Sequence, residues 1–185
     1  MKRKVLSLFL VVAMVLSLGI TVSAAEPADD LSGAVVILHT NDVHGAIDGY
    51  AKAAALKKTY EDMGAYVLLM DAGDFSQGDP TVSASQGATA VELMNLAGYD
   101  LAAPGNHEFD YGYQTLSTLA SEAEFPIVAA NVLYNGKTAF EDNVTFTAPD
   151  GTKIGVFGLD TPETATKAHP AKIQGVTFLS GDELV

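Results

Sequence analysis

Three apolar stretches of this chain each end abruptly in Asp, Asn or His residues that stand beside glycine. They occupy residues 35–45, 66–74 and 101–110. Short apolar runs that break off in this way are typical of buried strands. In open α/β sheets, ligands bind at the edge where the carboxyl ends of the strands meet. The pattern therefore predicts three buried strands whose ends converge on one polar site.

The polar residues at these strand ends suit divalent metal ions. Asp42 and His44 stand two positions apart, so in an extended chain their side chains point to the same side and can meet at one ion. Asp74 could bridge two ions, because a carboxylate has two oxygens and a full negative charge. Asn106 could supply an amide oxygen to the second ion. Two ions about 3.5–4 Å apart can hold the attacking and leaving oxygens of a phosphoryl transfer.

His107 follows the candidate ligand Asn106 directly. Because neighbouring side chains diverge, His107 is expected to face a substrate rather than to share that ion. There it could protonate or stabilise a leaving oxygen, while Asp110 holds its second ring nitrogen in the required tautomer. Asn41 could touch the substrate, although a turn role fits its position equally well.

Each of these residues has a plainer interpretation when it is taken alone. An Asp after a strand is most often a turn former or a helix cap, and a single His near a core is most often structural. The same departure at three strand ends favours a shared site. His39 and His169 are interpreted as structural or surface residues, and Asp71 as a support for the loop or the metal shell. Asp79 and Glu108 are interpreted as solvated or loop-stabilising.

Alternating strands and helices indicate a layered α/β domain. Helices are expected at residues 50–63, 89–97 and 113–122, and a long functional loop at 71–87. Strands are expected at residues 34–40, 65–70, 100–103, 126–131 and 176–179, with a β-hairpin formed by 144–147 and 153–159.

Residues 1–25 have the features of a removable signal peptide. Basic residues at positions 2–4 precede an apolar run at 5–20, and small residues follow at 22–25. The apolar run is shorter than the roughly 20 residues of a spanning helix, which disfavours the alternative of an uncleaved membrane anchor. Residues 26–33 are predicted to be a flexible mature N-terminus. The mature protein is expected to be secreted or extracytoplasmic, in the periplasm or at the cell surface, without stable membrane insertion.

The charge of the chain excludes some classes of partner and ligand. It has 10 basic and 23 acidic residues; three of the basic ones lie in the predicted signal peptide, which leaves a formal charge of −16. Such a surface repels nucleic acid and anionic lipid. The chain has no cysteine, so disulfides and thiolate metal sites are excluded. Only oxygen and nitrogen ligands remain for a metal.

Four segments together resemble the calcineurin-like metallophosphoesterases. These are residues 39–45 (HTNDVHG), 73–74 (GD), 105–110 (GNHEFD) and 158–164 (GLDTPET). The branch they are most similar to is the secreted 5′-nucleotidase family, which includes UDP-sugar hydrolases and 2′,3′-cyclic-nucleotide phosphodiesterases. The resemblance spans nearly the whole mature chain. It implies a layered β-sandwich of two sheets flanked by helices, followed by a C-terminal nucleotide-binding domain.

The resemblance also implies roles for individual residues. Asp42 and His44 would bind the first of two divalent ions (Mn, Zn, Co, Fe or Mg), Asp74 would bridge, and Asn106 would bind the second ion. The family's catalytic His-Asp pair corresponds to His107 and Asp110, and the substrate would contact Asn106 and His107. The implied activity is hydrolysis of nucleotide phosphoesters, with metal-activated hydroxide as the nucleophile and with His107 assisting.

The chain departs from the family pattern in its second half. Family members carry further histidine ligands in a later Gly-His-x-His-like segment, whereas here the one histidine after His107 is His169, in a context that does not match. Residues 34–185 are therefore expected to be the N-terminal portion of a catalytic domain, truncated and impaired on its own. The alternative is a non-enzymatic metal- or nucleotide-binding module.

Overall fold

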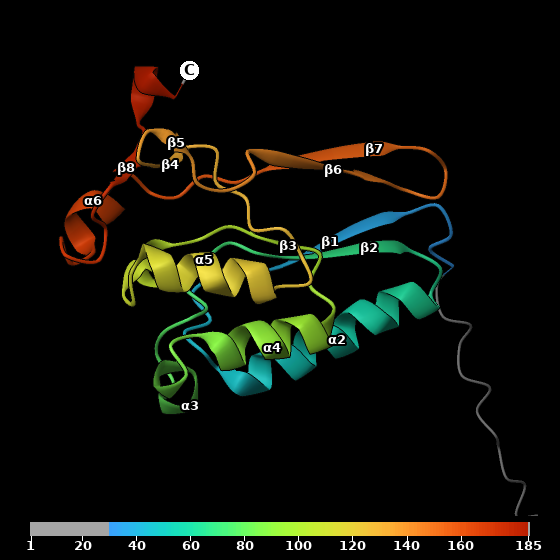
Figure 1. Ribbon diagram of the computed structural model, residues 1–185. Coiled ribbons are helices and arrows are strands. Elements are labelled where there is room, and N and C mark those ends of the chain that lie inside the picture. Colours follow the sequence, from blue (N-terminus) through green and yellow to red (C-terminus); the bar gives the residue numbers. More distant parts are fainter. Residues whose placement is uncertain (1–29, 185) are drawn as a thin grey trace, which may run out of the picture. The chain divides into compact units, whose positions relative to one another are not determined.

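The computed structural model describes residues 30–184 (Figure 1). The predicted signal peptide, residues 1–25, and most of the predicted N-terminal stretch 26–33 lie outside the described residues. Leu31 is tied to the rest of the domain, because its N–H donates to the Met63 carbonyl over 2.8 Å. No helix in the described part is both long and apolar enough to cross a membrane.

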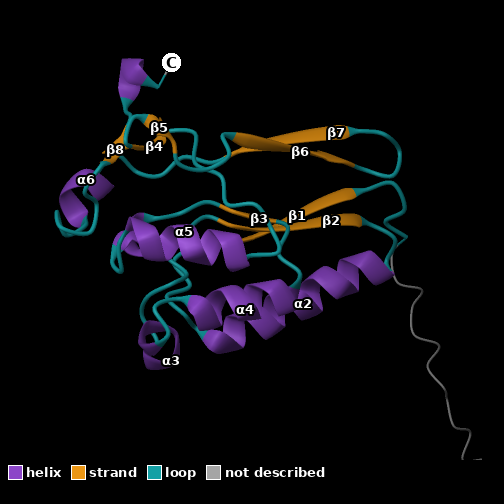
Figure 2. Ribbon diagram, in the orientation of Figure 1, coloured by secondary structure: helices purple, strands orange, loops and turns teal. Residues whose placement is uncertain are grey.

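A parallel sheet of three strands carries the polar loops (Figure 2). The strands β1 (Val35–Thr40), β2 (Tyr66–Asp71) and β3 (Leu101–Ala102) are adjacent in that order and all run parallel. The three predicted strands are confirmed, although β3 is two residues shorter than expected. The register pairs the last residues of neighbouring strands. The loops that follow the strands therefore start side by side.

The strands β1 and β2 differ in burial. Five of the six β2 residues are buried, as expected for a strand with neighbours on both sides. The prediction that β1 is buried is wrong, because Val35 and Ile37 are 38% and 54% exposed. Strand β1 is an edge of this sheet, and only the face that carries Leu38 packs against the helical core.

Each strand of the sheet is followed in the chain by a helix (Figure 1). Apolar side chains of these helices pack in one core with the sheet. The helices are α2 (Ile47–Asp62), α4 (Ala88–Ala97) and α5 (Tyr113–Glu122). All three were predicted, and α2 begins three residues earlier than expected. Leu69 of β2 and Ala102 of β3 share a core with Val91 and Met94 of α4. This packing holds the three polar loops at one edge of a rigid layer.

The predicted loop 71–87 contains a short helix that sequence reasoning missed. Helix α3 covers Pro80–Ala84. Asp79 caps it, because its Oδ1 accepts the Thr81 N–H over 2.8 Å. A capping Asp followed by Pro in the first turn is a helix-start signal, and the surrounding Gly and Ser residues obscured it.

A β-hairpin packs on the other face of the sheet, over β2 and β3. Its strands β6 (Asn143–Thr147) and β7 (Lys153–Phe157) are antiparallel, as predicted. Alternate hairpin side chains pack on apolar residues of β2 and β3 and on Val128; the hairpin residues are Val144, Phe146, Ile154 and Val156. Helices, parallel sheet and hairpin thus form successive layers (Figure 2). The structure confirms a mixed α/β domain with a second β layer.

The strand predicted at residues 126–131 is wrong in its position. Ile127 and Val128 make single bridges, to Ala102 and Glu141, and a strand begins only at β4 (Val132–Tyr134). Proline has no N–H to donate to a ladder, and Pro126 opens this segment.

Strand β4 pairs antiparallel with β5 (Lys137–Thr138) and with β8 (Val176–Phe178), which was predicted. The remaining short helices are η1 (Asn106–Phe109), α6 (Thr164–Lys167) and η2 (Gly181–Glu183).

A buried polar pair anchors the segment after β7. Asn131 and Asp160 are 1% and 2% exposed. The Asn131 side chain donates to the Asp160 carbonyl over 2.8 Å and accepts the Asp160 N–H over 2.9 Å. Burial raises the pKa of the Asp160 carboxyl group to about 7, against the opposing hydrogen bond from Thr164. Its Oδ2 has no hydrogen-bond partner among the described residues.

The raised pKa of Asp160 predicts a specific loss of stability with increasing pH. The folded protein binds this proton more tightly than the unfolded chain does, so the free energy of unfolding should fall as pH rises from about 4 to about 7. Between pH 5 and pH 8 the loss from this group is about 2–3 kcal/mol at 1.36 kcal/mol per unit. Asp160→Asn should remove it. Urea denaturation of the metal-free protein measures the effect, with exposed Asp142→Asn as control. Parallel pH profiles for wild type and Asp160→Asn would contradict this prediction.

Candidate metal centre

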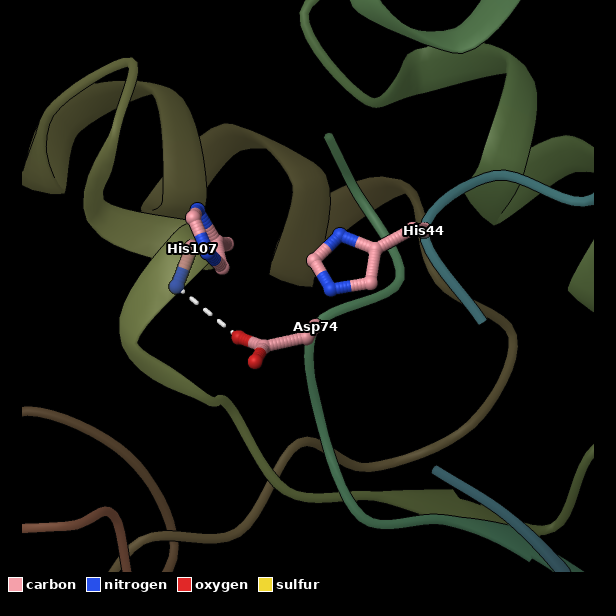
Figure 3. Close-up of side chains that lie close together, drawn as sticks. All are labelled: His44, Asp74 and His107. Carbon is pink, nitrogen blue, oxygen red and sulfur yellow. Dashed lines mark hydrogen bonds between the residues drawn. The ribbon is translucent and has the colours of Figure 1, made fainter. Parts of the chain in front are cut away.

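Three loops at the carboxyl edge of the parallel sheet bring His44, Asp74 and His107 together (Figure 3). Each loop follows one of the strands β1, β2 and β3. One ligand atom from each of the three side chains lies within 4.8 Å of the other two. The two imidazole rings approach edge to face, with centroids 5.0 Å apart. One carboxylate and two imidazoles at this spacing are a donor set that fits a divalent transition metal.

The backbone of this site is unusual at three positions. Asp42, His44 and Asp74 all lie in the left-handed region, with φ of 53°, 47° and 61°. Five non-glycine residues of the described chain have positive φ, and these are three of them. Such conformations persist only where the surroundings enforce them, and they concentrate at functional sites. This strain is independent support for a site at these loops.

Main-chain hydrogen bonds lock the first two loops together. The Asp42 N–H donates to the Gly73 carbonyl over 3.0 Å, and the His44 N–H donates to the Asp74 carbonyl over 2.9 Å. Asp42 and His44 lie beyond β1, which ends at Thr40, and both have positive φ. The expectation that an extended chain aligns their side chains is therefore wrong. Their side chains nevertheless approach, with Asp42 Oδ1 3.7 Å from His44 Nε2.

Gln77 defines the orientation of the His44 ring. His44 Nδ1 lies 3.2 Å from the Gln77 carbonyl oxygen and 3.3 Å from Gln77 Oε1. Because both oxygens accept, Nδ1 carries the proton in the neutral ring. Nε2 then keeps its lone pair for a metal, on the side where Asp42 lies. Sequence reasoning did not single out Gln77, and no local pattern marks it.

His107 and Asp110 form the pair that the sequence suggested. His107 Nδ1 lies 2.7 Å from Asp110 Oδ2. Partial burial lowers the pKa of His107, but the hydrogen bond and charge of Asp110, with smaller effects from Asp74 and Glu108, outweigh it and raise the pKa above its usual value. Asp110 therefore favours the imidazolium form and leaves Nε2 directed away from the pair.

The two other predicted ligands, Asp42 and Asn106, and the two remaining histidines lie outside the three-residue cluster. Asp42 has a side chain that is 60% exposed, and the Asn41 side chain donates a hydrogen bond to it. Asn106 is half-buried and begins η1. His39 lies on the exposed face of β1. His169 is exposed, and its Nδ1 accepts the Ala171 N–H over 3.2 Å. Neither of these two histidines belongs to the three-residue cluster.

Asp71 lies beneath the site in a buried hydrogen-bond network. Its carboxylate accepts Thr40 Oγ1 over 2.5 Å and the Gly73 N–H over 2.8 Å. Tyr99 contacts the same Thr40 hydroxyl over 2.9 Å. Burial raises the pKa of Asp71 to about 7, and both hydrogen bonds oppose the rise. These contacts make Asp71 a support of the loop that carries Asp74.

Glu108 is buried, so the solvated alternative considered for it is wrong. It is 1% exposed. It accepts main-chain hydrogen bonds from the loop after β2, at Asp74, and from the loop after β3, at Gly105. Burial raises its pKa above the ordinary value, while these hydrogen bonds oppose the rise. One local signal could have identified it: Glu108 stands three residues after Gly105, as the acidic residue of a helix-start motif does.

Comparison with known proteins shows the family of the chain. The family model for calcineurin-like phosphoesterases matches residues 35–174. The trifunctional nucleotide phosphoesterase YfkN of Bacillus subtilis is 33% identical over 81% of this chain and 13% of its own length. A 5′-nucleotidase of Vibrio cholerae is 34% identical over 85% of this chain and 31% of its own length. The chain thus spans less than a third of either relative.

Solved structures share the fold as well. A 5′-nucleotidase precursor from Thermus thermophilus aligns with a TM-score of 0.67 at 29% identity, over 78% of this chain and 31% of that one. The calcineurin-like phosphoesterase YfkN from Bacillus subtilis aligns with a TM-score of 0.68 at 26% identity, over 80% and 55% of the two chains. Sequence, strand-end chemistry and fold agree: this chain belongs to the calcineurin-like phosphoesterase family.

Proposed function

We propose that this chain carries part of the active site of a metal-dependent hydrolase that cleaves phosphoesters of nucleotides. The observation that carries the proposal is the convergence of His44, Asp74 and His107 within 4.8 Å. Relatives named as 5′-nucleotidases support a small nucleotide as the substrate. The strongly acidic composition argues against a polyanionic substrate such as nucleic acid.

The proposed ligands are the residues whose chemistry suits hard and borderline divalent ions. Asp42 and His44 would hold one ion, Asn106 a second, and Asp74 would lie between the two. Bound divalent ions supply Lewis-acid polarisation of phosphoryl oxygens and lower the pKa of water. The donor set is compatible with Mn, Zn, Co, Fe or Mg.

His107 is proposed as the residue that assists the leaving oxygen. Asp110 holds Nδ1, so Nε2 is the atom that faces a substrate. In the metal-free protein the raised pKa keeps the ring protonated to higher pH than a free imidazole. Nε2 can then donate a proton or a hydrogen bond to the oxygen that departs from phosphorus. Asn106 is proposed to contact the substrate beside it, and Asn41 is proposed as a further contact.

The extent and location of the active protein are also proposals. Residues 34–185 are proposed to be the N-terminal portion of a catalytic domain, with further ligands and a nucleotide-binding domain in additional sequence. The coverage of about 31% of the length of a related 5′-nucleotidase supports this. Residues 1–25 are proposed to be a secretion signal, on the grounds of their basic start and apolar run. An extracytoplasmic location follows from that proposal.

Metal stoichiometry tests the proposed function most directly. Residues 26–185 would be titrated with Mn²⁺ and with Zn²⁺ by calorimetry, while 5′-AMP hydrolysis is assayed along the same titration. We expect at least one ion to bind and turnover to be weak or absent. Two tightly bound ions with full turnover would show that the site is complete in this chain and would contradict the proposed need for further ligands. No binding of either ion would contradict the proposed metal site itself.

A further inference from the structure

Glu108 connects the two loops that carry Asp74 and His107. Its Oε2 accepts the N–H groups of Asp74 and Gly105, each over 2.7 Å. Its Oε1 accepts the N–H groups of Phe75 and Ser76, each over 2.9 Å. Each carboxylate oxygen therefore has two donors. A side chain that is 1% exposed thus has a full set of partners without water.

These donors come from separate parts of the chain. Three belong to the loop after β2, more than 30 residues before Glu108, and one belongs to the loop after β3. No main-chain acceptor is found within the described residues for the N–H groups of Asp74, Phe75 and Ser76. Glu108 is thus the acceptor that allows this strained loop to be buried.

The strained residue is the candidate ligand itself. Asp74 has φ of 61°, and its Oδ1 accepts the His107 N–H over 2.9 Å (Figure 3). Gly105 passes so close that a Cβ there would lie 2.9 Å from Asp74 Cγ. The position of the Asp74 carboxylate is therefore set by main-chain contacts, and Glu108 fixes the main chain on both sides of the contact.

We propose that Glu108 is a positioning residue that holds Asp74 in its left-handed conformation, with the carboxylate directed at His44 and His107. Glu108 touches neither the proposed ions nor the substrate; it acts through Asp74. The expected effect on metal affinity rests on the proposed function. The hold on the loop, meaning the restraint of residues 74–76 by Glu108, does not.

Amide hydrogen exchange in the wild-type protein tests the hold on the loop. The N–H groups of Asp74, Phe75 and Ser76 should exchange at least about 100-fold more slowly than unstructured amides, because their acceptor is buried. Exchange of all three at the rate of unstructured amides would overturn the proposal. This measurement needs neither a variant nor a metal.

The variant Glu108→Gln tests the consequence for the metal. It keeps the shape of the side chain but replaces one oxygen by an NH₂ group, which faces two N–H donors and accepts from neither. We expect the protection of Asp74 or of Phe75 and Ser76 to be lost, and Mn²⁺ affinity to fall about 10- to 100-fold, as for residues that orient ligands. Exposed Glu92→Gln on α4 is the matched control and should change neither.

The outcomes separate this inference from the proposed function. Folded Glu108→Gln with wild-type Mn²⁺ affinity would overturn the positioning role. If Glu108→Gln does not fold, the wild-type exchange rates still decide whether the carboxylate holds the loop. A wild-type protein that binds no Mn²⁺ but keeps the three amides protected would overturn the proposed function and the effect on affinity, while the hold on the loop would stand.

Discussion

Replacing Asp74 with alanine should lower the affinity of the protein for Mn²⁺ by at least about 100-fold, which exceeds the effect typical of residues that only orient ligands. Asp74 is the one carboxylate in the cluster of three candidate ligands. The imidazoles of His44 and His107 bring no negative charge, so the variant removes the only negative charge of this three-residue cluster. Asp42, the other carboxylate proposed as a ligand, has a largely exposed side chain, which weakens its attraction for an ion.

A second substitution separates the charge of Asp74 from its structural contact. Asp74→Asn keeps an Oδ1 that can accept the His107 N–H, yet it removes the negative charge. Both variants should therefore lose metal affinity, and Asp74→Asn should retain more of the wild-type stability. Calorimetric titration with Mn²⁺ and urea denaturation measure the two quantities, with exposed Asp142→Ala as the control. An affinity loss below about threefold in both variants would contradict the assignment of Asp74 as a ligand.

Replacing His107 with alanine should reduce kcat for phosphoester hydrolysis by about 10²- to 10⁴-fold, the range of general acid–base catalysis. Mn²⁺ affinity should stay within about threefold of wild type, because the proposed role of His107 is toward the leaving oxygen. The alternative role of His107 is that of a metal ligand, because one of its ring nitrogens lies within 4.8 Å of ligand atoms of His44 and Asp74. Affinity and turnover measured together distinguish the two roles.

The His107 experiment needs a preparation with measurable turnover, either the present chain or the longer protein proposed above. His169→Ala is the matched control, because that histidine is exposed and lies outside the cluster. Loss of metal affinity in parallel with kcat would identify His107 as a ligand. Unchanged kcat in His107→Ala would contradict both roles.

The sequence predicted the polar edge of the sheet because its signals are local. An apolar run that ends in Asp or His beside glycine shows where a strand stops, and parallel strands place such ends together. Burial of β1 was predicted wrongly because burial, unlike the end of a strand, is not a local property. The hydrophobicity of Ile37 shows that the strand can be buried, but the number of layers over it depends on elements distant in the chain.

The parts of the site that sequence reasoning missed depend on long-range hydrogen bonds. Gln77 meets His44 across 33 residues. The loop-stabilising alternative for Glu108 was correct, but its contacts with amides more than 30 residues away were not predicted. No periodicity or spacing encodes such contacts. The left-handed φ of Asp42 and His44 was missed as well, because the residues were treated as a continuation of the strand. The ligand types were evident from the sequence, whereas the backbone that presents them was not.

The left-handed backbone at Asp42, His44 and Asp74 also limits which replacements natural variation can accept. Asp and Asn tolerate this conformation better than other non-glycine residues, because their short side chains can hydrogen-bond locally. Asp→Glu, the usual exchange that preserves charge, would keep a metal-binding group but lose that backbone preference. Each position must therefore satisfy a chemical and a conformational requirement at once, and few of the twenty amino acids meet both.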